Sequence, residues 1–306
     1  MTTRRWVLVS LSGLAMACGQ SPEDDLSVTT AQLDTAEGNG RPEPPMLGAH
    51  QVRGEAGPGG GGGALMTWHS GAIMTSSTVK AIFWGASWAS ASFVADKMSG
   101  LDSFYAGYNG SHYAAASTEY TGSNGVVGTA VAYAGHAIDL SAAPARAPKV
   151  SAIAAEVCKL ITDPVANGYY PVYTDTRRGS AGYCAWHSYG ACNGVPVQFG
   201  FFFNLDGDAG CDPQDARTDH SQGLEALANV SAHELSETVT DPRNGGWYDS
   251  SGGENGDKCA WAFNVPFVTF SDGGTWKLQG EWSNAAFTAG TGYANRSGQL
   301  GCLSGI

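Results

Sequence analysis

The chain has 306 residues, a formal net charge of −12 and 14% charged residues. Its 28 acidic side chains against 16 Lys and Arg argue against a nucleic-acid partner, because phosphate binding requires clustered basic residues. The 43 glycines, 9 tryptophans and 12 tyrosines are typical of a turn-rich fold that contains β-structure.

The N-terminus has the layout of an export signal. Arg4 and Arg5 precede an apolar stretch at residues 6–17, and small residues flank Cys18. The stretch is shorter than the roughly 20 residues that span a bilayer, which predicts a removed signal peptide at residues 1–18. The position of Cys18 resembles a lipobox, so Cys18 is the candidate for lipidation, with secretion without a lipid as the alternative.

Residues 19–63 are expected to form a tether without fixed structure. They combine scattered acids, a proline-rich stretch at residues 41–45 and a glycine run at residues 57–63, and they lack the apolar side chains of a core. Residues 64–306 are expected to fold as a single globular domain. The expected location is secreted or at the outer surface, in contact with a membrane only through a lipid on Cys18. The oligomeric state stays open.

The folded part is predicted to interleave strands and helices. Strands are expected at residues 79–84, 125–134, 169–174 and 195–203, and helices at residues 91–108, 150–161 and 222–240. The strand at residues 195–203 is almost wholly apolar, as central strands are. This order favours an α+β or mixed α/β fold with a central mixed sheet, flanking helices and a loop-rich C-terminal part.

Six cysteines remain in the body of the chain when Cys18 is set aside. An even number favours three disulfides in an oxidising compartment, and the absence of a CxxC spacing argues against a cysteine zinc site. The short loop between Cys184 and Cys192 favours a bond between these two residues. The pairing of the others stays open: Cys158, Cys211, Cys259 and Cys302.

The helix predicted at residues 222–240 contains the sequence HELSE at residues 233–237. Residues four apart lie one turn above each other, so His233 and Glu237 point the same way. The HExxH zinc signature has this geometry with two histidines, and here the Glu237 carboxylate takes the place of the second. Glu234 would be the general base. An apolar stripe on another side of the helix would pack on the core and leave His233 and Glu237 facing a cleft.

A third ligand is expected from the acidic loop that follows. Pro242 ends the helix and lets the chain fold back. Glu254 is the preferred third ligand, with Asp249 and Asp257 as alternatives. The expected metal is zinc, with calcium second because oxygen ligands predominate in this loop.

Three residues have two interpretations each. Asp241 is a candidate ligand, but it lies about 12 Å along the helix axis from His233, so bonding to the backbone before Pro242 is an equal alternative. His220 is a further candidate ligand. His187 either lines the same cleft or is a structural histidine beside a disulfide. The HELSE sequence itself also has an ordinary interpretation, as the solvated face of a helix.

Several stretches resemble the phosphate-induced protein 1 family, the EXORDIUM-like proteins of plants. They are LMTWHSG at residues 65–71, VKAIFWG at residues 79–85, the segment from Tyr183 to His187, and VTDP followed by GWY at residues 239–248. The resemblance covers roughly residues 65–290. Plant members lack the HExxE residues, so a metal is implied only by bacterial and fungal relatives, which look like zincin-type metal proteins. The positions that match those relatives are His233, Glu234, Glu237, Asp241, Asp249, Glu254, Asp257 and Cys259.

The expected function is that of a metal-dependent hydrolase with a zincin-like active-site helix and a peptide as substrate. The alternative is a non-catalytic protein that binds a cell-surface polymer or wall polysaccharide through exposed Trp and Tyr, with a metal that only braces the loop at residues 241–259. No GxSxG motif, P-loop or dinucleotide fingerprint supports a serine triad or a nucleotide site.

Overall fold

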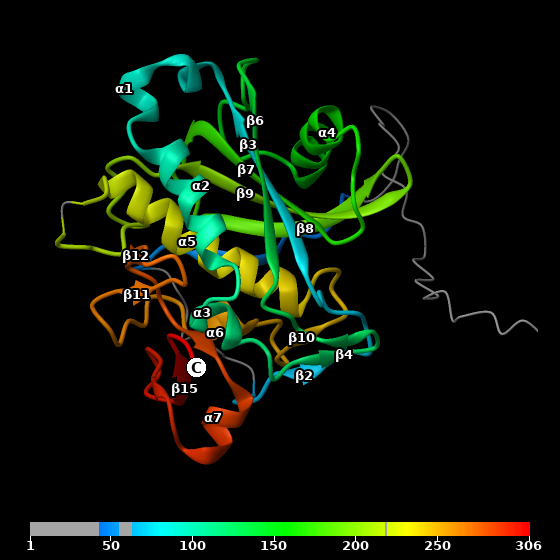
Figure 1. Cartoon of the computed structure of the whole chain (residues 1–306), viewed down its shortest axis with the longest axis vertical. Helices are drawn as coiled ribbons and strands as arrows, with labels where there is room; N and C mark the ends of the chain where they lie inside the picture. The colour runs from blue at the N-terminus through cyan, green and yellow to red at the C-terminus, as the bar shows by residue number, and fades with distance from the viewer. Residues whose placement is uncertain (1–42, 55–62, 218) are drawn as a thin grey trace, which may run out of the picture. The chain divides into compact units, whose positions relative to one another are not determined.

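The computed structural model describes residues 43–54, 63–217 and 219–306, all of which belong to one compact unit, residues 31–306. The predicted signal peptide with Cys18 lies outside the described residues. The fold is α+β, as predicted: a six-stranded mixed sheet with helices on both faces (Figure 1). Among the described helices, none combines the length and the apolar composition needed to cross a membrane.

The central sheet has the strand order β1-β8-β9-β7-β3-β6. The strands β9, β7, β3 and β6 run parallel to one another, whereas β8 and β1 continue the sheet antiparallel. The almost wholly apolar strand β9 lies inside the sheet, which confirms its expected central position. The bounds are β1 (Leu47–Gln51), β3 (Ser77–Trp84), β6 (Val131–Asp139), β7 (Gly168–Arg177), β8 (Tyr183–Cys192) and β9 (Val195–Asn204).

Three helices cover the sheet. Helix α4 (Val150–Leu160) packs on one face, and helices α2 (Lys97–Tyr108) and α5 (Gln222–Thr240) pack on the other. The side chains of β8 alternate between these faces. Cys192 therefore reaches α4, where it bonds to Cys158, whereas His187 points toward α5. This alternation brings His187 to the face that carries the HELSE sequence.

Smaller elements surround the sheet and build most of the C-terminal part. Short paired strands are β2 (Thr67–Trp68) with β10 (Trp247–Tyr248), β4 (Thr121–Gly122) with β5 (Gly125–Val126), β11 (Val268–Thr269) with β12 (Thr275–Trp276), and β15 (Leu300–Leu303) between β13 (Glu281–Trp282) and β14 (Tyr293–Ala294). Short helices are η1 (Ala86–Ala89), α1 (Ala91–Val94), α3 (His112–Ala115), α6 (Asn255–Lys258) and α7 (Asn284–Ala289).

Two predicted elements have different limits in the structure. The single helix expected at residues 91–108 is two helices, α1 and α2, because Ala95 leaves the helical conformation with φ 46°. The strand expected at residues 125–134 is divided between β5 and β6, which begins at Val131. Helices α4 and α5 confirm the helices predicted at residues 150–161 and 222–240.

The folded body begins before residue 64, so the tether expected at residues 19–63 is too long. Strand β1 lies within that range and pairs with β8 in the central sheet. The side chains of His50 and Val52 are buried. The residues around β1 have a low apolar content, so composition does not predict a strand there. The strand forms because its backbone pairs with β8. The other residues of the predicted tether, 19–42 and 55–62, lie outside the described residues.

Three disulfides are present, but the expected bond between Cys184 and Cys192 is wrong. These residues lie at opposite ends of β8, and eight residues of strand span about 26 Å, far beyond the reach of a disulfide. The observed pairs are Cys158–Cys192, Cys184–Cys211 and Cys259–Cys302. Three disulfides are typical of proteins that fold in an oxidising compartment.

Candidate metal centre

Helix α5 positions the HELSE sequence in the interior. Ser221 caps the helix N-terminus by accepting a hydrogen bond from the backbone of Leu224, and Pro242 follows directly after Asp241 at its C-terminus. His233 and Glu237 lie one turn apart, with Nε2 of His233 3.1 Å from Oε1 of Glu237. Every residue from Gly223 to Thr240 is buried. Other elements of the fold cover this face, so within the described part of the chain there is no cleft where one was expected.

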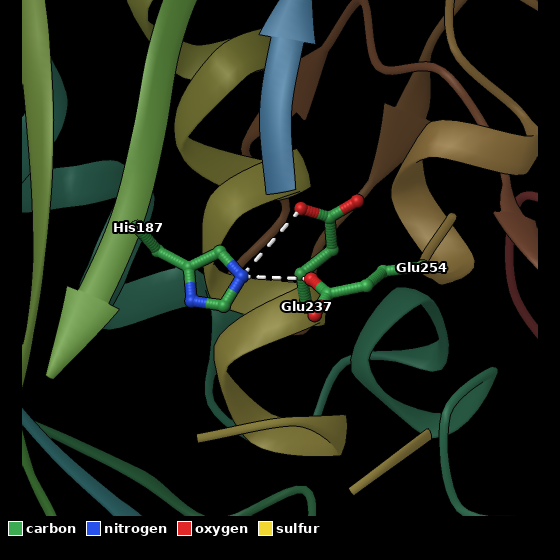
Figure 2. Close-up of side chains that lie close together, drawn as sticks. All are labelled: His187, Glu237 and Glu254. Carbon is green, nitrogen blue, oxygen red and sulfur yellow. Dashed lines mark hydrogen bonds and ion pairs between the residues drawn. The ribbon is translucent and has the colours of Figure 1, made fainter. Parts of the chain in front are cut away.

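Residues from β8 and α6 complete the cluster around Glu237. Nε2 of His187 lies 2.7 Å from Oε2 of Glu254 and 3.8 Å from Oε2 of Glu237 (Figure 2). Oδ1 of Asp257 lies 3.7 Å from Nε2 of His233, and the backbone N–H of Asp257 donates to Oε1 of Glu237 over 2.8 Å. Two groups with metal-ligand spacing therefore share Glu237: His187–Glu237–Glu254 and His233–Glu237–Asp257.

The other predicted ligands have different partners. Oδ1 of Asp241 accepts the backbone N–H groups of Gly245 and Gly246, each over 2.7 Å, as the alternative interpretation of this residue anticipates. Asp249 forms an ion pair with Lys258 over 3.2 Å and accepts hydrogen bonds within its own loop. Neither residue belongs to a group with metal-ligand spacing among the described residues.

The cluster concentrates negative charge away from water. The residues Glu234, Glu237, Asp241 and Glu254 are at most 2% exposed. Among the described residues, no Lys or Arg forms an ion pair with any of them. Burial raises the pKa of Glu237 to about 8, and burial followed by the charges of Glu237 and Asp241 raises the pKa of Glu254 well above its ordinary value. Only a bound cation or bound protons can neutralise such a group.

A glutamine decides which nitrogen of His233 carries the proton. Nε2 of Gln279 donates to the carbonyl of Gly256 over 2.9 Å, and Oε1 accepts from the backbone N–H of Trp261 over 3.1 Å, which determines the orientation of the amide. The same Nε2 lies 2.9 Å from Nδ1 of His233. Nδ1 of His233 is therefore an acceptor, and the proton of the neutral ring is on Nε2.

His187 has no such constraint. Its Nδ1 has no hydrogen-bond partner among the described residues, whereas its Nε2 faces the two carboxylates. Burial, followed by the charge of His233, lowers the pKa of His187 to about 3, and burial lowers the pKa of His233 to about 4. Both rings are neutral near pH 7, which is the form that binds metals, but only His187 can present a bare Nε2 to the cluster.

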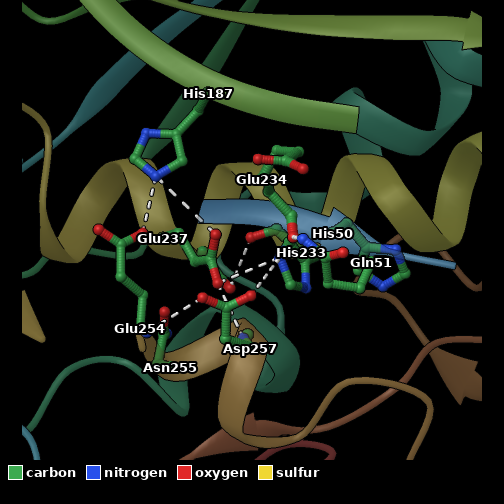
Figure 3. A network of polar contacts seen from close by, with 12 residues as sticks. His50, Gln51, His187, His233, Glu234, Glu237, Glu254, Asn255 and Asp257 are labelled. Carbon is green, nitrogen blue, oxygen red and sulfur yellow. Dashed lines mark hydrogen bonds and ion pairs between the residues drawn. The ribbon is translucent and has the colours of Figure 1, made fainter. Parts of the chain in front are cut away.

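Glu234 lies beside these groups, with its carboxyl group near the backbone of His50 (Figure 3). Its side chain has no exposure, and neither carboxylate oxygen has a hydrogen-bond partner among the described residues. Burial, followed by the charges of Glu237 and Asp257, raises the pKa of Glu234 well above its ordinary value. A buried carboxyl group with two free oxygens is costly in a protein interior, which marks Glu234 as a functional candidate.

Backbone segments close the cluster at two glycines. At Gly48 of β1, which has φ 45°, an added Cβ would overlap Oε2 of Glu237 and lie 2.7 Å from Nε2 of His187. At Gly256 of α6, an added Cβ would lie 2.8 Å from Nδ1 of His233 and 2.9 Å from Oε1 of Glu237. Glycine is required at both places because the backbone passes directly against the functional atoms.

A second cluster lies at the N-terminal end of α5. Nδ1 of His220 lies 2.6 Å from Oε1 of Glu225, and Asp219 is close enough to complete a group with metal-ligand spacing. Arg217 lies 3.7 Å from Glu225 and 3.6 Å from Asp219, so a protein cation already occupies this site. The candidate ligand His220 therefore lies apart from the HELSE cluster, in a group with its own counter-charge.

Two residues of the centre carry no sequence motif. His50 and Gln279 are isolated in the sequence, yet the ring of His50 lies edge-on to that of His233 at 4.2 Å, and Gln279 orients both rings. No spacing rule could have found them, because they meet α5 only through the fold. Comparison of the chain with protein families, with curated proteins and with solved structures gave no match.

Proposed function

We propose that this protein binds a divalent metal through His187, Glu237 and Glu254. The observation that carries the proposal is the set of buried carboxylates that have no Lys or Arg partner among the described residues, together with Oε2 of Glu237, which has no hydrogen-bond partner there. One imidazole and two carboxylates form a donor set that suits zinc, and the excess of oxygen also suits harder cations. The free Nδ1 of His187 allows its Nε2 to act as the third donor.

The reaction that best fits the centre is metal-dependent hydrolysis of a peptide bond. A bound divalent cation would polarise a carbonyl group and lower the pKa of water. Glu234 is the candidate to accept the proton of the attacking water, because its carboxyl group is buried beside the cluster, and a bound cation would favour the ionised form that a base requires. The proton on Nε2 of His233 provides a hydrogen-bond donor for the oxygen of the scissile carbonyl.

The proposed setting is the cell exterior. The three disulfides, the signal-like N-terminus and the acidic composition support export, with Cys18 as the candidate for a lipid anchor. Membership of the phosphate-induced protein 1 family, in the branch with HExxE, is part of the same proposal. It rests on the motifs at residues 65–71, 79–85 and 239–248.

Elemental analysis of the purified full-length protein tests the metal. We expect about one equivalent of zinc or another divalent metal in the wild type, and little in His187→Ala. His136→Ala is the matched control, because His136 is a partly exposed residue that pairs with Asp102 away from the cluster. Equal metal content in all three proteins would contradict the proposed ligands.

The Glu234→Gln variant tests catalysis separately from metal binding. The amide keeps the shape of the side chain but cannot accept a proton from water. We expect unchanged metal content and at least a hundredfold lower hydrolysis of a peptide library. If the metal-loaded wild type cleaves no peptide, or if Glu234→Gln cleaves peptides as fast, the proposed reaction is wrong.

A non-catalytic binding function is the second candidate, because the ligand atoms have almost no contact with solvent. Trp68 of β2 is 43% exposed, and His69 stacks on Tyr248 with ring centroids 3.5 Å apart. Such aromatic surfaces bind sugars in many proteins, and a buried metal would then only brace α5 and α6. Binding of wall polysaccharide that survives chelation and is lost in Trp68→Ala would favour this candidate.

A further inference from the structure

We infer that β1 lies in a groove that binds an extended peptide when β1 leaves it. The peptide would run antiparallel to β8 across the metal centre. This inference rests on the proposed function and names its substrate class. The centre as it stands admits no substrate, because the side chains of His187, Glu237 and Glu254 are at most 3% exposed. Strand β1 is one of the elements that cover them, and it belongs to the N-terminal segment rather than to the helices that carry the centre.

The backbone of β1 passes the reactive groups as a substrate would. Gly48 lies against Oε2 of Glu237 and the ring of His187, and its backbone also faces His233. Two residues later, the ring of His50 lies edge-on to that of His233, with the ring centroids 4.2 Å apart (Figure 3). A peptide in this place would bring one of its peptide groups to the carboxylates, and that peptide would need glycine at the position of Gly48.

The pairing of β1 with β8 is weaker than that of its neighbours. Only Leu47, His50 and Gln51 have partners in register with β8, and irregularities separate each step. Strands β8 and β9, by contrast, pair without interruption from Ala185 to Cys192. Without β1, strand β8 would be a free sheet edge, and such edges bind extended peptides through their backbone N–H and C=O groups.

Strand β1 is anchored at both ends as well as by His50, whose Nε2 lies 2.9 Å from Oε1 of Gln279 in the metal centre. Ser188 donates to the carbonyl of Pro45 over 2.7 Å at the start of the strand. At its end, the backbone N–H of Arg53 donates to Gly210 over 2.8 Å, and the Arg53 guanidinium lies 5.1 Å from the centre of the Trp261 ring. Loosening these anchors should release β1 without altering a ligand.

The variant Gly48→Ala tests the inference in the full-length protein. The added methyl group would overlap Oε2 of Glu237 and lie 2.7 Å from the ring of His187, and alanine is strained at φ 45°, so we expect β1 to be displaced. We expect at least tenfold faster hydrogen exchange at residues 47–51 than in the wild type. Gly54→Ala is the matched control, because an added Cβ at Gly54 meets no atom within 4 Å. Unchanged exchange in Gly48→Ala would overturn the inference.

Peptide binding then reports on the vacated groove. The probe is a synthetic peptide with the sequence of residues 45–52, PMLGAHQV. We expect it to bind Gly48→Ala at least tenfold more tightly than the wild type or Gly54→Ala, in which β1 still fills the groove. The same peptide with alanine in place of its glycine should not bind. Equal binding of the two peptides, or no binding to a protein whose β1 has been released, would overturn the inference.

Hydrolysis distinguishes this inference from the proposed function. If the glycine peptide binds but no peptide is cleaved, the groove is real and the proposed reaction is wrong. If peptides are cleaved but the glycine peptide does not bind to the released groove, the reaction stands and the inference is wrong. Should Gly48→Ala fail to fold, Arg53→Ala weakens the anchor after β1 by removing the side-chain contacts with Gln214 and Trp261, and it gives the same two measurements.

Discussion

The two ends of helix α5 carry clusters of the same residue types but differ in counter-charge. At the N-terminal end, Arg217 lies within 4 Å of both Glu225 and Asp219, and the Asp219 side chain is 49% exposed. In the HELSE cluster, Glu237 and Glu254 are buried without a Lys or Arg partner among the described residues. A His and carboxylate group therefore indicates a metal only where the protein supplies no cation of its own.

Removal of the metal should have the largest effect, which is a loss of stability of the folded protein. When free metal exceeds its Kd a thousandfold, binding stabilises the folded state by about 4 kcal/mol. A chelator should therefore lower the Tm of the full-length protein by about 8–16 °C, given the usual change for a domain of this size. Calorimetry with parallel elemental analysis measures both quantities. An unchanged Tm in metal-depleted protein would show that the HELSE cluster needs no cation.

Matched substitutions at the two ends of α5 sharpen the comparison. Glu237→Gln removes the carboxylate that both metal-type groups share, and we expect at least a hundredfold loss of metal affinity by titration calorimetry. Glu225→Gln changes the same residue type in the cluster that holds Arg217, and metal affinity should stay within about twofold of the wild type. A larger loss of metal affinity in Glu225→Gln would show that the metal binds in the N-terminal cluster instead.

Glu281 is a buried carboxyl group outside both clusters. It tests what burial of a carboxyl group without a cation costs in stability. Glu281 accepts hydrogen bonds from Ser117 over 2.5 Å and from Tyr108 over 3.4 Å, and burial raises its pKa to about 8. Above about pH 5 the unfolded chain has released this proton, whereas the folded protein holds it until about pH 8. Unfolding therefore releases a proton in this window, and rising pH destabilises the fold.

The Glu281→Gln variant should remove this contribution. Between about pH 5 and 8 we expect wild-type stability to change relative to the variant by up to about 1.4 kcal/mol per pH unit, with the wild type losing stability as the pH rises. Denaturant unfolding at several pH values measures the difference between the two proteins. A difference that is independent of pH would mean that Glu281 is ionised in the folded state.

The smallest expected effect belongs to Arg217. Its ion pairs are partly exposed, so Arg217→Ala should change the free energy of unfolding by less than about 1 kcal/mol. If counter-charge is what separates the two clusters, the variant should also gain weak zinc binding at His220 and Glu225. Zinc titration with His220→Ala as control checks this, and no gain would show that the N-terminal cluster lacks a suitable geometry.

The sequence by itself determined the helix that carries the centre and the residues around it. Apolar residues at helical spacing predict α5, Pro242 marks its end, and the spacing of HELSE places His233 one turn from Glu237, because these are local properties of a helix. The even number of body cysteines likewise predicts three disulfides. Glu254 and Asp257 could be named as neighbours of the helix because the chain turns back directly after it.

Only the tertiary structure decided how these residues combine. His187 and Gly48 come from strands far apart in the sequence, and the sheet order and the alternation of β8 bring them to Glu237, whereas Gln279 reaches His233 from the C-terminal part of the chain. The length of β8 separates Cys184 from Cys192, so each bonds to a cysteine from another part of the chain. Burial of all of α5 also depends on the fold, since an isolated helix with this many polar residues would face water. Burial and counter-charge depend on neighbours that come from the whole fold, so a local sequence pattern cannot predict them.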